Sequence, residues 1–250
     1  MLFDLQHNLF MIVSAIVIAL LLVFAGIFVK QRRYKDLILK VFAVITVIIH
    51  FSTLYVDYFS TGAAEIESPM ILPIYPCNIA MWLLLIVAFY RNKDSKVFKI
   101  LAEITFYLGI IGGVFGIVFN EIYASTPSLA VYDTLNGLLS HDTMLFGCLY
   151  LLVGKYVKIR VSNLISIAIG LVLLFVDGWV IICLYKIFKL SPPNSMFLLE
   201  PPLPELPWFN TYVIGALAIV LFFGITALYE QIALKKEDRW YYKLKNRRNK

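Results

Sequence analysis

Hydrophobic residues along this chain form seven long runs, and short polar segments separate them. The runs have these approximate bounds: Leu9–Val29, Asp36–Asp57, Met70–Tyr90, Val97–Phe119, Thr134–Val153, Val161–Tyr185 and Thr211–Glu230. A helix of about 20 apolar residues spans the hydrocarbon core of a bilayer, so each run predicts one transmembrane helix. We therefore predict an all-α membrane protein, with a bundle of seven transmembrane helices over residues 1–234 and a basic tail over residues 235–250.

The composition favours the same class of protein. Hydrophobic residues make up 61% of the 250 positions and charged residues only 15%, and the mean hydropathy is +0.83. The three cysteines all lie in apolar runs without a spaced framework, so we expect neither a structural disulfide nor a cysteine-based zinc site. The first run follows Asp4 instead of basic residues and lacks a small-residue cleavage site, which indicates a retained helix and not a signal peptide.

The distribution of charge predicts how the bundle is oriented. Lys and Arg concentrate in the connectors after the first, third, fifth and seventh runs, whereas the other connectors carry these acids: Glu65, Glu67, Glu121, Asp133, Glu200 and Glu205. The positive-inside rule then places the N-terminus outside and the C-terminus in the cytoplasm, in a multi-pass protein that we expect in a bacterial plasma membrane. A juxtamembrane basic tail favours attraction to anionic lipid over binding to nucleic acid.

Several polar residues fall at one depth below the predicted outer surface. Cys77, His50 and His141 each lie seven residues from the outer end of a run, which is about 10 Å at the helical rise. Asp177 lies about 12 Å deep by the same rise, and His7 stands just outside the first run. Ionisable groups are costly inside a membrane and usually face a cavity or a partner. The shared depth predicts one polar pocket open to the outer leaflet, and the alternative is a set of separately satisfied buried residues.

Local sequence supports such a pocket at the start of the third run. Pro73 and Pro76 prevent regular winding until about Cys77, so the thiol and the Asn78 amide fall in the first regular turn. On the second run a polar face contains Thr46, His50, Thr53 and Asp57. The fourth run carries a ridge of small residues, which predicts close approach of another helix: Gly109, Gly112, Gly113 and Gly116.

The connector between the sixth and seventh runs is the longest segment predicted outside. It extends from Ser191 to Trp208 and contains six prolines, which forbid a regular helix. Its residues 196–199 are apolar enough to enter the membrane interface. A functional lid and a simple interfacial anchor are both consistent with this pattern.

An ordered set of short motifs resembles a known family. The motifs are Gln6-His7 before the first helix, Leu72-Pro73 and Cys77 opening the third, Ser140-His141 in the fifth, Asn194-Ser195-Met196-Phe197-Leu198 in the last outer loop and Leu206-Pro207-Trp208 before the seventh. This set resembles the YwaF-type bacterial integral membrane family, which is similar to the eukaryotic transmembrane protein 164 acyltransferases. The likeness covers nearly the whole chain.

The resemblance implies a phospholipid acyltransferase or transacylase. By it, Cys77 would be the nucleophile and His141 its base, phospholipid and lyso-phospholipid would be the partners, and no cofactor or metal would be needed. We expect the Cys77 sulfur to lie within about 6 Å of a His141 ring nitrogen. Binding or supporting roles would fall to His7, His50, Tyr75, Asn78, Asp177 and Asn194. Where relatives often carry His or Gln two residues before the cysteine, this chain has Tyr75, followed by Pro76.

Other functions are consistent with parts of the same pattern. Buried His and Asp residues also mark proton pathways of transporters, although the polar groups here gather in the outer half and no inverted repeat is apparent. A scaffold or lipid-binding partner for another membrane enzyme would share the same composition. A zinc-dependent lipid hydrolase is less favoured, because no two histidines are spaced by three or four residues.

Overall fold

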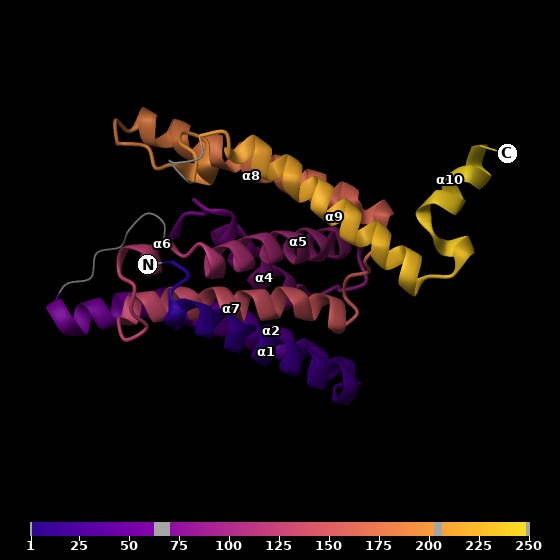
Figure 1. Ribbon diagram of the computed structural model, residues 1–250, viewed down its shortest axis with the longest axis horizontal. Helices are drawn as coiled ribbons and strands as arrows, with labels where there is room; N and C mark the ends of the chain where they lie inside the picture. Colours follow the sequence, from indigo (N-terminus) through magenta and orange to yellow (C-terminus); the bar gives the residue numbers. More distant parts are fainter. Residues whose placement is uncertain (1, 63–70, 203–206, 249–250) are drawn as a thin grey trace. The chain divides into compact units, whose positions relative to one another are not determined.

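The computed structural model describes residues 2–62, 71–202 and 207–248 (Figure 1). Within those ranges the regular structure is helical, and no strand occurs. The chain divides into two compact units, Met1–Val157 and Lys158–Lys250. The all-α prediction is thus confirmed, whereas the predicted division into residues 1–234 and 235–250 stays a prediction.

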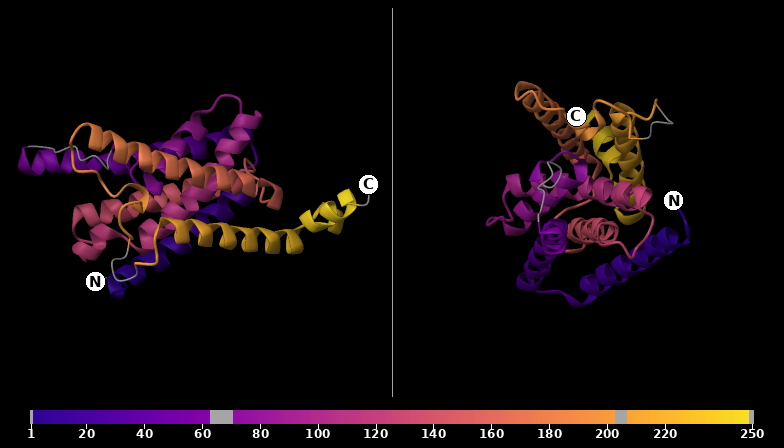
Figure 2. Two further views of the ribbon diagram at one scale, coloured as in Figure 1. Left: turned by 90° about the horizontal axis from the view of Figure 1, so that it is seen from above. Right: turned by 90° about the vertical axis from the view of Figure 1, so that its left-hand side faces the viewer.

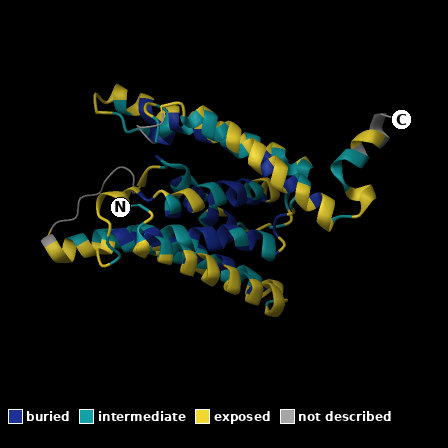
Figure 3. Cartoon of the chain, viewed as in Figure 1, coloured by how far each residue is buried: buried dark blue, intermediate teal, exposed yellow. Residues whose placement is uncertain are grey.

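The first unit holds the predicted nucleophile and base. Its helices are α1 (Leu5–Phe28), α2 (Arg32–Thr61), α4 (Pro76–Phe89), α5 (Lys96–Val118), α6 (Glu121–Ser125) and α7 (Tyr132–Val153). Helix α5 packs against α4 and α7, and α7 also packs against α2 and α1. Buried residues line α5 and α7 (Figure 3). The core of this unit therefore lies around the helix with the glycine ridge and the helix with His141.

The second unit contains two long helices, the outer loop and the tail. Its elements are η1 (Val161–Asn163), α8 (Leu164–Ile187), η2 (Ser195–Phe197), α9 (Thr211–Ala233), η3 (Lys236–Asp238) and α10 (Trp240–Arg248). The chain leaves α9 through η3 and enters α10 (yellow in Figure 2). Helices α8 and α9 meet where α8 begins and α9 ends, because Val161 N–H donates to Glu230 Oε1 at 2.8 Å.

Five stretches among the described residues are helical, long and apolar enough to cross a membrane. They are Leu5–Phe28, Arg32–Ser60, Lys96–Ser125, Val161–Ile187 and Thr211–Ala233. The third and fifth predicted spans differ from these. Helix α4 has 14 residues because Pro76 sets its start, and α7 has 22 residues but carries several polar ones. The count of seven spans and the orientation therefore stay predictions, and Glu65, Glu67, Met70, Glu205 and Leu206 lie outside the described residues.

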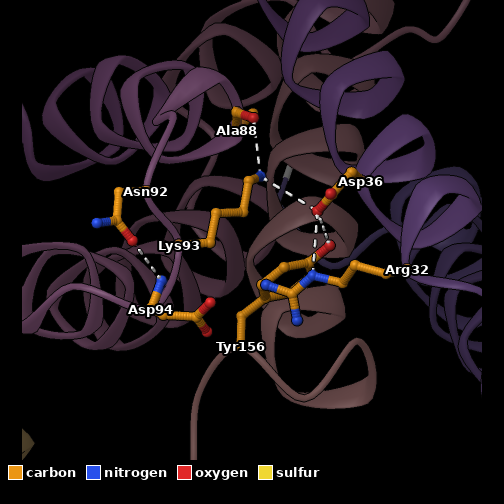
Figure 4. Close-up of polar contacts among 7 residues, drawn as sticks. All are labelled: Arg32, Asp36, Ala88, Asn92, Lys93, Asp94 and Tyr156. Atoms are coloured by element: carbon orange, nitrogen blue, oxygen red, sulfur yellow. Dashed lines mark hydrogen bonds and ion pairs between the residues drawn. The ribbon is translucent and has the colours of Figure 1, made fainter.

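A polar cluster joins three basic connectors at one end of the first unit (Figure 4). Asp36 accepts a 2.5 Å hydrogen bond from the Tyr156 hydroxyl and pairs with Lys93 at 3.4 Å and Arg32 at 3.6 Å. The Arg32 guanidinium lies 4.4 Å from the Tyr156 ring centroid. Burial, and then the hydrogen bond to Asp36, raises the pKa of the Tyr156 hydroxyl. The connectors after the first, third and fifth runs thus meet at one end, as alternating spans require.

A second polar cluster lies at the start of α1. The Asp4 side chain caps the helix by accepting the His7 N–H at 2.9 Å, and it also accepts the Tyr123 hydroxyl at 2.6 Å. These hydrogen bonds, that of Tyr123 first, hold the pKa of Asp4 below its ordinary 3.8. The N-terminal segment is therefore attached to α6, close to the end of α5.

Candidate functional site

Cys77 lies in the first turn of α4. The helix begins at Pro76, and Tyr75 caps it by donating its N–H to Asn78 Oδ1 at 3.1 Å. The Asn78 N–H in turn donates to the Tyr75 carbonyl at 3.0 Å. The backbone N–H groups of Cys77 and Asn78 interact with the half-buried Cys77 sulfur. The predicted effect of the two prolines is confirmed, with the helix starting one residue before Cys77.

The glycine ridge of α5 permits the close helix contacts that its spacing predicts. A Cβ atom added to Gly109 would lie 2.1 Å from the Cys148 sulfur, and one added to Gly113 would lie 2.9 Å from Leu145 Cβ. Both neighbours belong to α7. No side chain fits between the two helices at these positions, so the ridge sets how closely α5 and α7 approach.

The same ridge contacts both Cys77 and His141. A Cβ atom at Gly112 would lie 2.9 Å from Cys77 Cα, and one at Gly116 would lie 2.2–2.4 Å from three atoms of the His141 ring. Residues four apart on one helix face have Cβ positions about 5–6 Å apart. The Cys77 Cβ and the His141 ring therefore lie at most about 12 Å apart, on neighbouring turns of α5. The closer approach of sulfur to ring nitrogen stays a prediction.

The His141 ring presents an unoccupied nitrogen to the protein interior. Its Nδ1 is buried and has no hydrogen-bond partner in the described part of the chain. The adjacent Asp142 interacts with another helix, since its Oδ2 accepts the Ser14 hydroxyl of α1 at 2.6 Å. The ring thus packs against Gly116, and no hydrogen bond from the described residues reaches its Nδ1.

His50 lies at nearly the same level as His141. Helices α2 and α7 are antiparallel: Thr46 Oγ1 lies 3.2 Å from Thr143 Oγ1, and Thr53 Oγ1 accepts from Asn136 Nδ2 at 2.5 Å. This register places His50 opposite residue 139, two residues from His141. The offset along the helix axis is about 3 Å. The predicted polar face of the second run therefore contacts α7 through its two threonines, with His50 between them in sequence.

Hydrogen bonds and ring stacking hold the His7 side chain in a fixed position. It is fully buried, its Nε2 donates to the Ile117 carbonyl at 2.8 Å and its Nδ1 accepts the Phe3 N–H at 3.1 Å. The ring also stacks on Tyr123, with centroids 4.6 Å apart. Both ring nitrogens are occupied, so His7 is not placed to accept a proton. It donates to the carbonyl of the residue that follows Gly116, and its supporting role at the site stays a prediction.

The two remaining predicted site residues belong to the second unit. Asp177 has a buried Oδ2 without a partner among the residues described. Asn194 organises the outer loop: its Oδ1 accepts the N–H groups of Leu199 and Glu200, both at 3.1 Å. Met196 has φ 51° and packs against Gly178 of α8. The loop thus folds back onto α8, and the supporting roles of Asp177 and Asn194 stay predictions.

The other two cysteines differ from Cys77 in their surroundings. All three have free thiols, but Cys148 is fully buried against Gly109 and Cys183 is exposed on α8. Within the ranges that the structure covers, no group of three His, Cys, Asp or Glu residues could hold a metal ion. Of the three cysteines, only Cys77 is partly buried, lies at the N-terminus of a helix and has the His141 helix, α7, as a neighbour.

Sequence reasoning missed the residues that bring the site together. It identified Gly112 and Gly116 as a packing ridge but not as the contacts of Cys77 and His141. It also missed Asn120, whose Nδ2 donates to the Gly116 carbonyl at 3.0 Å. The available signal was the spacing: Gly112, Gly116 and Asn120 are each four residues apart, and so lie along one side of the chain as it leaves α5.

Comparison with protein families gives one match. The model of the TMEM164 family matches residues 2–229, which include every predicted site residue. The chain belongs to the TMEM164 family. This TMEM164-family chain is a membrane protein with several apolar helices, and its YwaF-type bacterial subdivision stays a prediction. Comparisons with curated proteins and with solved structures each found no match.

Proposed function

We propose that this TMEM164-family protein is a phospholipid acyltransferase that uses Cys77 as nucleophile and His141 as base in a pocket of the outer leaflet. The observation that carries the proposal is the contact of both residues with one glycine ridge, Cys77 at Gly112 and His141 at Gly116. Catalysis by a cysteine and a histidine requires such proximity, because the imidazole must reach the thiol proton.

The first half-reaction forms a thioester on Cys77. The unoccupied Nδ1 of His141 takes the thiol proton, and the sulfur attacks the carbonyl carbon of a phospholipid ester. The carbon–oxygen bond to the lyso-phospholipid then breaks, and the imidazolium returns its proton to the departing alkoxide. The acyl chain is now attached to sulfur, and the histidine is neutral again.

The second half-reaction restores the thiol. A hydroxyl of an acceptor lyso-phospholipid loses its proton to His141 and attacks the thioester carbonyl. The carbon–sulfur bond breaks, and the proton passes to the sulfur. Because an ester is exchanged for an ester, no nucleotide or coenzyme A is required.

The start of α4 offers a site for the oxyanion of both steps. The first N–H groups of a helix lack the usual partner four residues earlier. The Cys77 N–H approaches the sulfur, and so does the Asn78 N–H, which also donates to the Tyr75 carbonyl. A carbonyl oxygen bound at the thioester would lie near the same donors. Removal of one such donor costs about a hundredfold or more in kcat.

The test is a transfer assay in detergent with a phospholipid radiolabelled in one acyl chain. We expect the wild type to label a lyso-phospholipid acceptor and to retain hydroxylamine-sensitive label on the protein. Cys77→Ala is expected to lose both, while Cys148→Ala, which removes a buried thiol that packs against the same glycine ridge, keeps both. Transfer by Cys77→Ala at the wild-type rate would end the covalent mechanism, and absence of transfer by every form would favour a scaffold or transporter.

A further inference from the structure

A narrow cleft lies between α8 and α9 in the second unit. It has a volume of about 270 Å³ and is lined only by apolar side chains: Leu164, Ile167, Ala168, Ile219, Val220 and Phe223. Sites that enclose a whole drug-sized ligand start at about 300 Å³. The cleft can therefore hold only part of a larger molecule, such as a segment of an acyl chain.

A buried carboxylate fixes the structure at one end of this cleft. Glu230 is only 2% exposed, and its two oxygens accept the N–H groups of Val161 and Trp240, both at 2.8 Å. It thereby holds the segment before α8 and the start of α10 against the end of α9. The Trp240 ring lies 5.8 Å from that of Phe223, a residue of the cleft lining. The tail is thus attached where the cleft ends.

The same end carries more positive than negative charge, since the exposed Glu237 and Asp238 are outnumbered by the Lys and Arg residues around them. Lys158 and Lys236 are exposed there, three residues before Val161 and six after Glu230 respectively. Arg160 and Arg239 already donate to the backbone carbonyls of Asp238 and Leu234. Leu164 follows Val161 by three residues and Phe223 precedes Glu230 by seven, so the cleft begins about 5–10 Å from the hydrogen bond that joins Val161 to Glu230.

We propose that this end of the α8–α9 pair binds one anionic phospholipid, with a chain segment in the cleft and its phosphate against Lys158 and Lys236. The apolar cleft suits the acyl chain of such a lipid, and the nearby cations suit its phosphate. A zwitterionic lipid has no net negative charge and gains less, because each Lys near the ligand adds attraction for net negative charge. The proposed lipid site shares no residue with the Cys77 site, and the proposal does not rest on the acyltransferase activity.

The experiment measures lipid binding to the purified full-length protein by native mass spectrometry. The probes are dioleoyl phosphatidylglycerol, dioleoyl phosphatidylcholine and inorganic phosphate. We expect the Lys158→Gln, Lys236→Gln double variant to lose about 30-fold in affinity for phosphatidylglycerol, from about fivefold for each charge. The matched control, Lys186→Gln with Lys189→Gln, removes two exposed cations from the other end of α8 and is expected to bind as the wild type does.

A second variant tests the cleft. Ala168→Phe fills it without changing charge, and we expect at least a tenfold weaker binding of phosphatidylglycerol. Equal binding of phosphatidylcholine, equal losses in both lysine double variants, or full binding in Ala168→Phe would each overturn the proposal. Displacement of the lipid by inorganic phosphate alone would also overturn it, because the site would then be a phosphate site without a chain component.

Discussion

The contact between Gly116 and His141 can be tested by adding one methyl group. In Gly116→Ala the new Cβ would lie 2.2–2.4 Å from three atoms of the His141 ring, whereas carbon atoms in contact lie about 3.5–4.0 Å apart. The ring must therefore move by more than about 1 Å, or the two helices must separate. A displacement of that size in a catalytic group costs about a hundredfold in rate.

The effect on stability is expected to be smaller than the effect on activity. Overpacking costs about 1–3 kcal/mol, and alanine in a helix recovers about 0.5–1 kcal/mol relative to glycine. The net destabilisation is therefore about 1–2 kcal/mol. Thermal unfolding in detergent gives this value, and the acyl-transfer assay gives the rate for the same preparation.

Two glycine variants serve as controls. Gly113→Ala also overpacks α5, but against Leu145 and not against the histidine, so it should lose stability without a hundredfold loss of rate. Gly224→Ala has no atom within 4 Å of the added Cβ, so it should keep the wild-type rate and gain about 0.5–1 kcal/mol of stability. Wild-type activity in Gly116→Ala, or an equal loss of rate in Gly113→Ala, would refute the role of this contact in placing His141.

Three further predictions concern other parts of the chain. A reporter fused after Lys250 should be active only in the cytoplasm, and one inserted at Pro202 only outside. A membrane-impermeant thiol reagent added outside should alkylate half-buried Cys77 faster than fully buried Cys148. Burial, and then the hydrogen bond to Asp36, raises the pKa of Tyr156 above 10.0, so its contribution to stability should be complete below about pH 10 and be lost as the pH rises further. Tyr156→Phe should weaken that alkaline loss in thermal unfolding.

Each of these predictions has a contradicting result. An external C-terminus would remove the basis for calculating depth from the outer surface. Equal alkylation of the two thiols would show that Cys77 is no more accessible than a core cysteine. An unchanged alkaline melting profile in Tyr156→Phe would mean that the hydroxyl of Tyr156 does not determine the pH dependence.

The helices and the glycine ridge could be predicted from the sequence because both depend on local patterns. Hydropathy located α1, α2, α5, α8 and α9 to within a few residues, and the small residues of α5 indicated a close helix contact. The start of α4 was predictable for the same reason, since proline restricts only its own neighbourhood.

The arrangement of the site depends on which helices meet and could not be predicted in that way. Their similar depth suggested that His7, His50 and His141 line one polar pocket. Depth, however, does not define the direction in which a side chain points. The structure instead uses both ring nitrogens of His7 for backbone contacts and leaves Nδ1 of His141 without a partner among the described residues. Only the Phe3 N–H is a local partner of His7; its other partner, the Ile117 carbonyl, lies 110 residues away, and the sequence near His141 does not reveal that Nδ1 lacks a partner among the described residues.

The most direct test of the covalent mechanism is peptide mapping of the protein after incubation with a phospholipid of defined chains. The mechanism predicts that the peptide containing Cys77 gains the mass of one donor acyl group through a hydroxylamine-sensitive bond, and that His141→Ala lowers the yield at least a hundredfold. An acyl group found on another residue, or transfer to lyso-phospholipid with no adduct on Cys77, would contradict it.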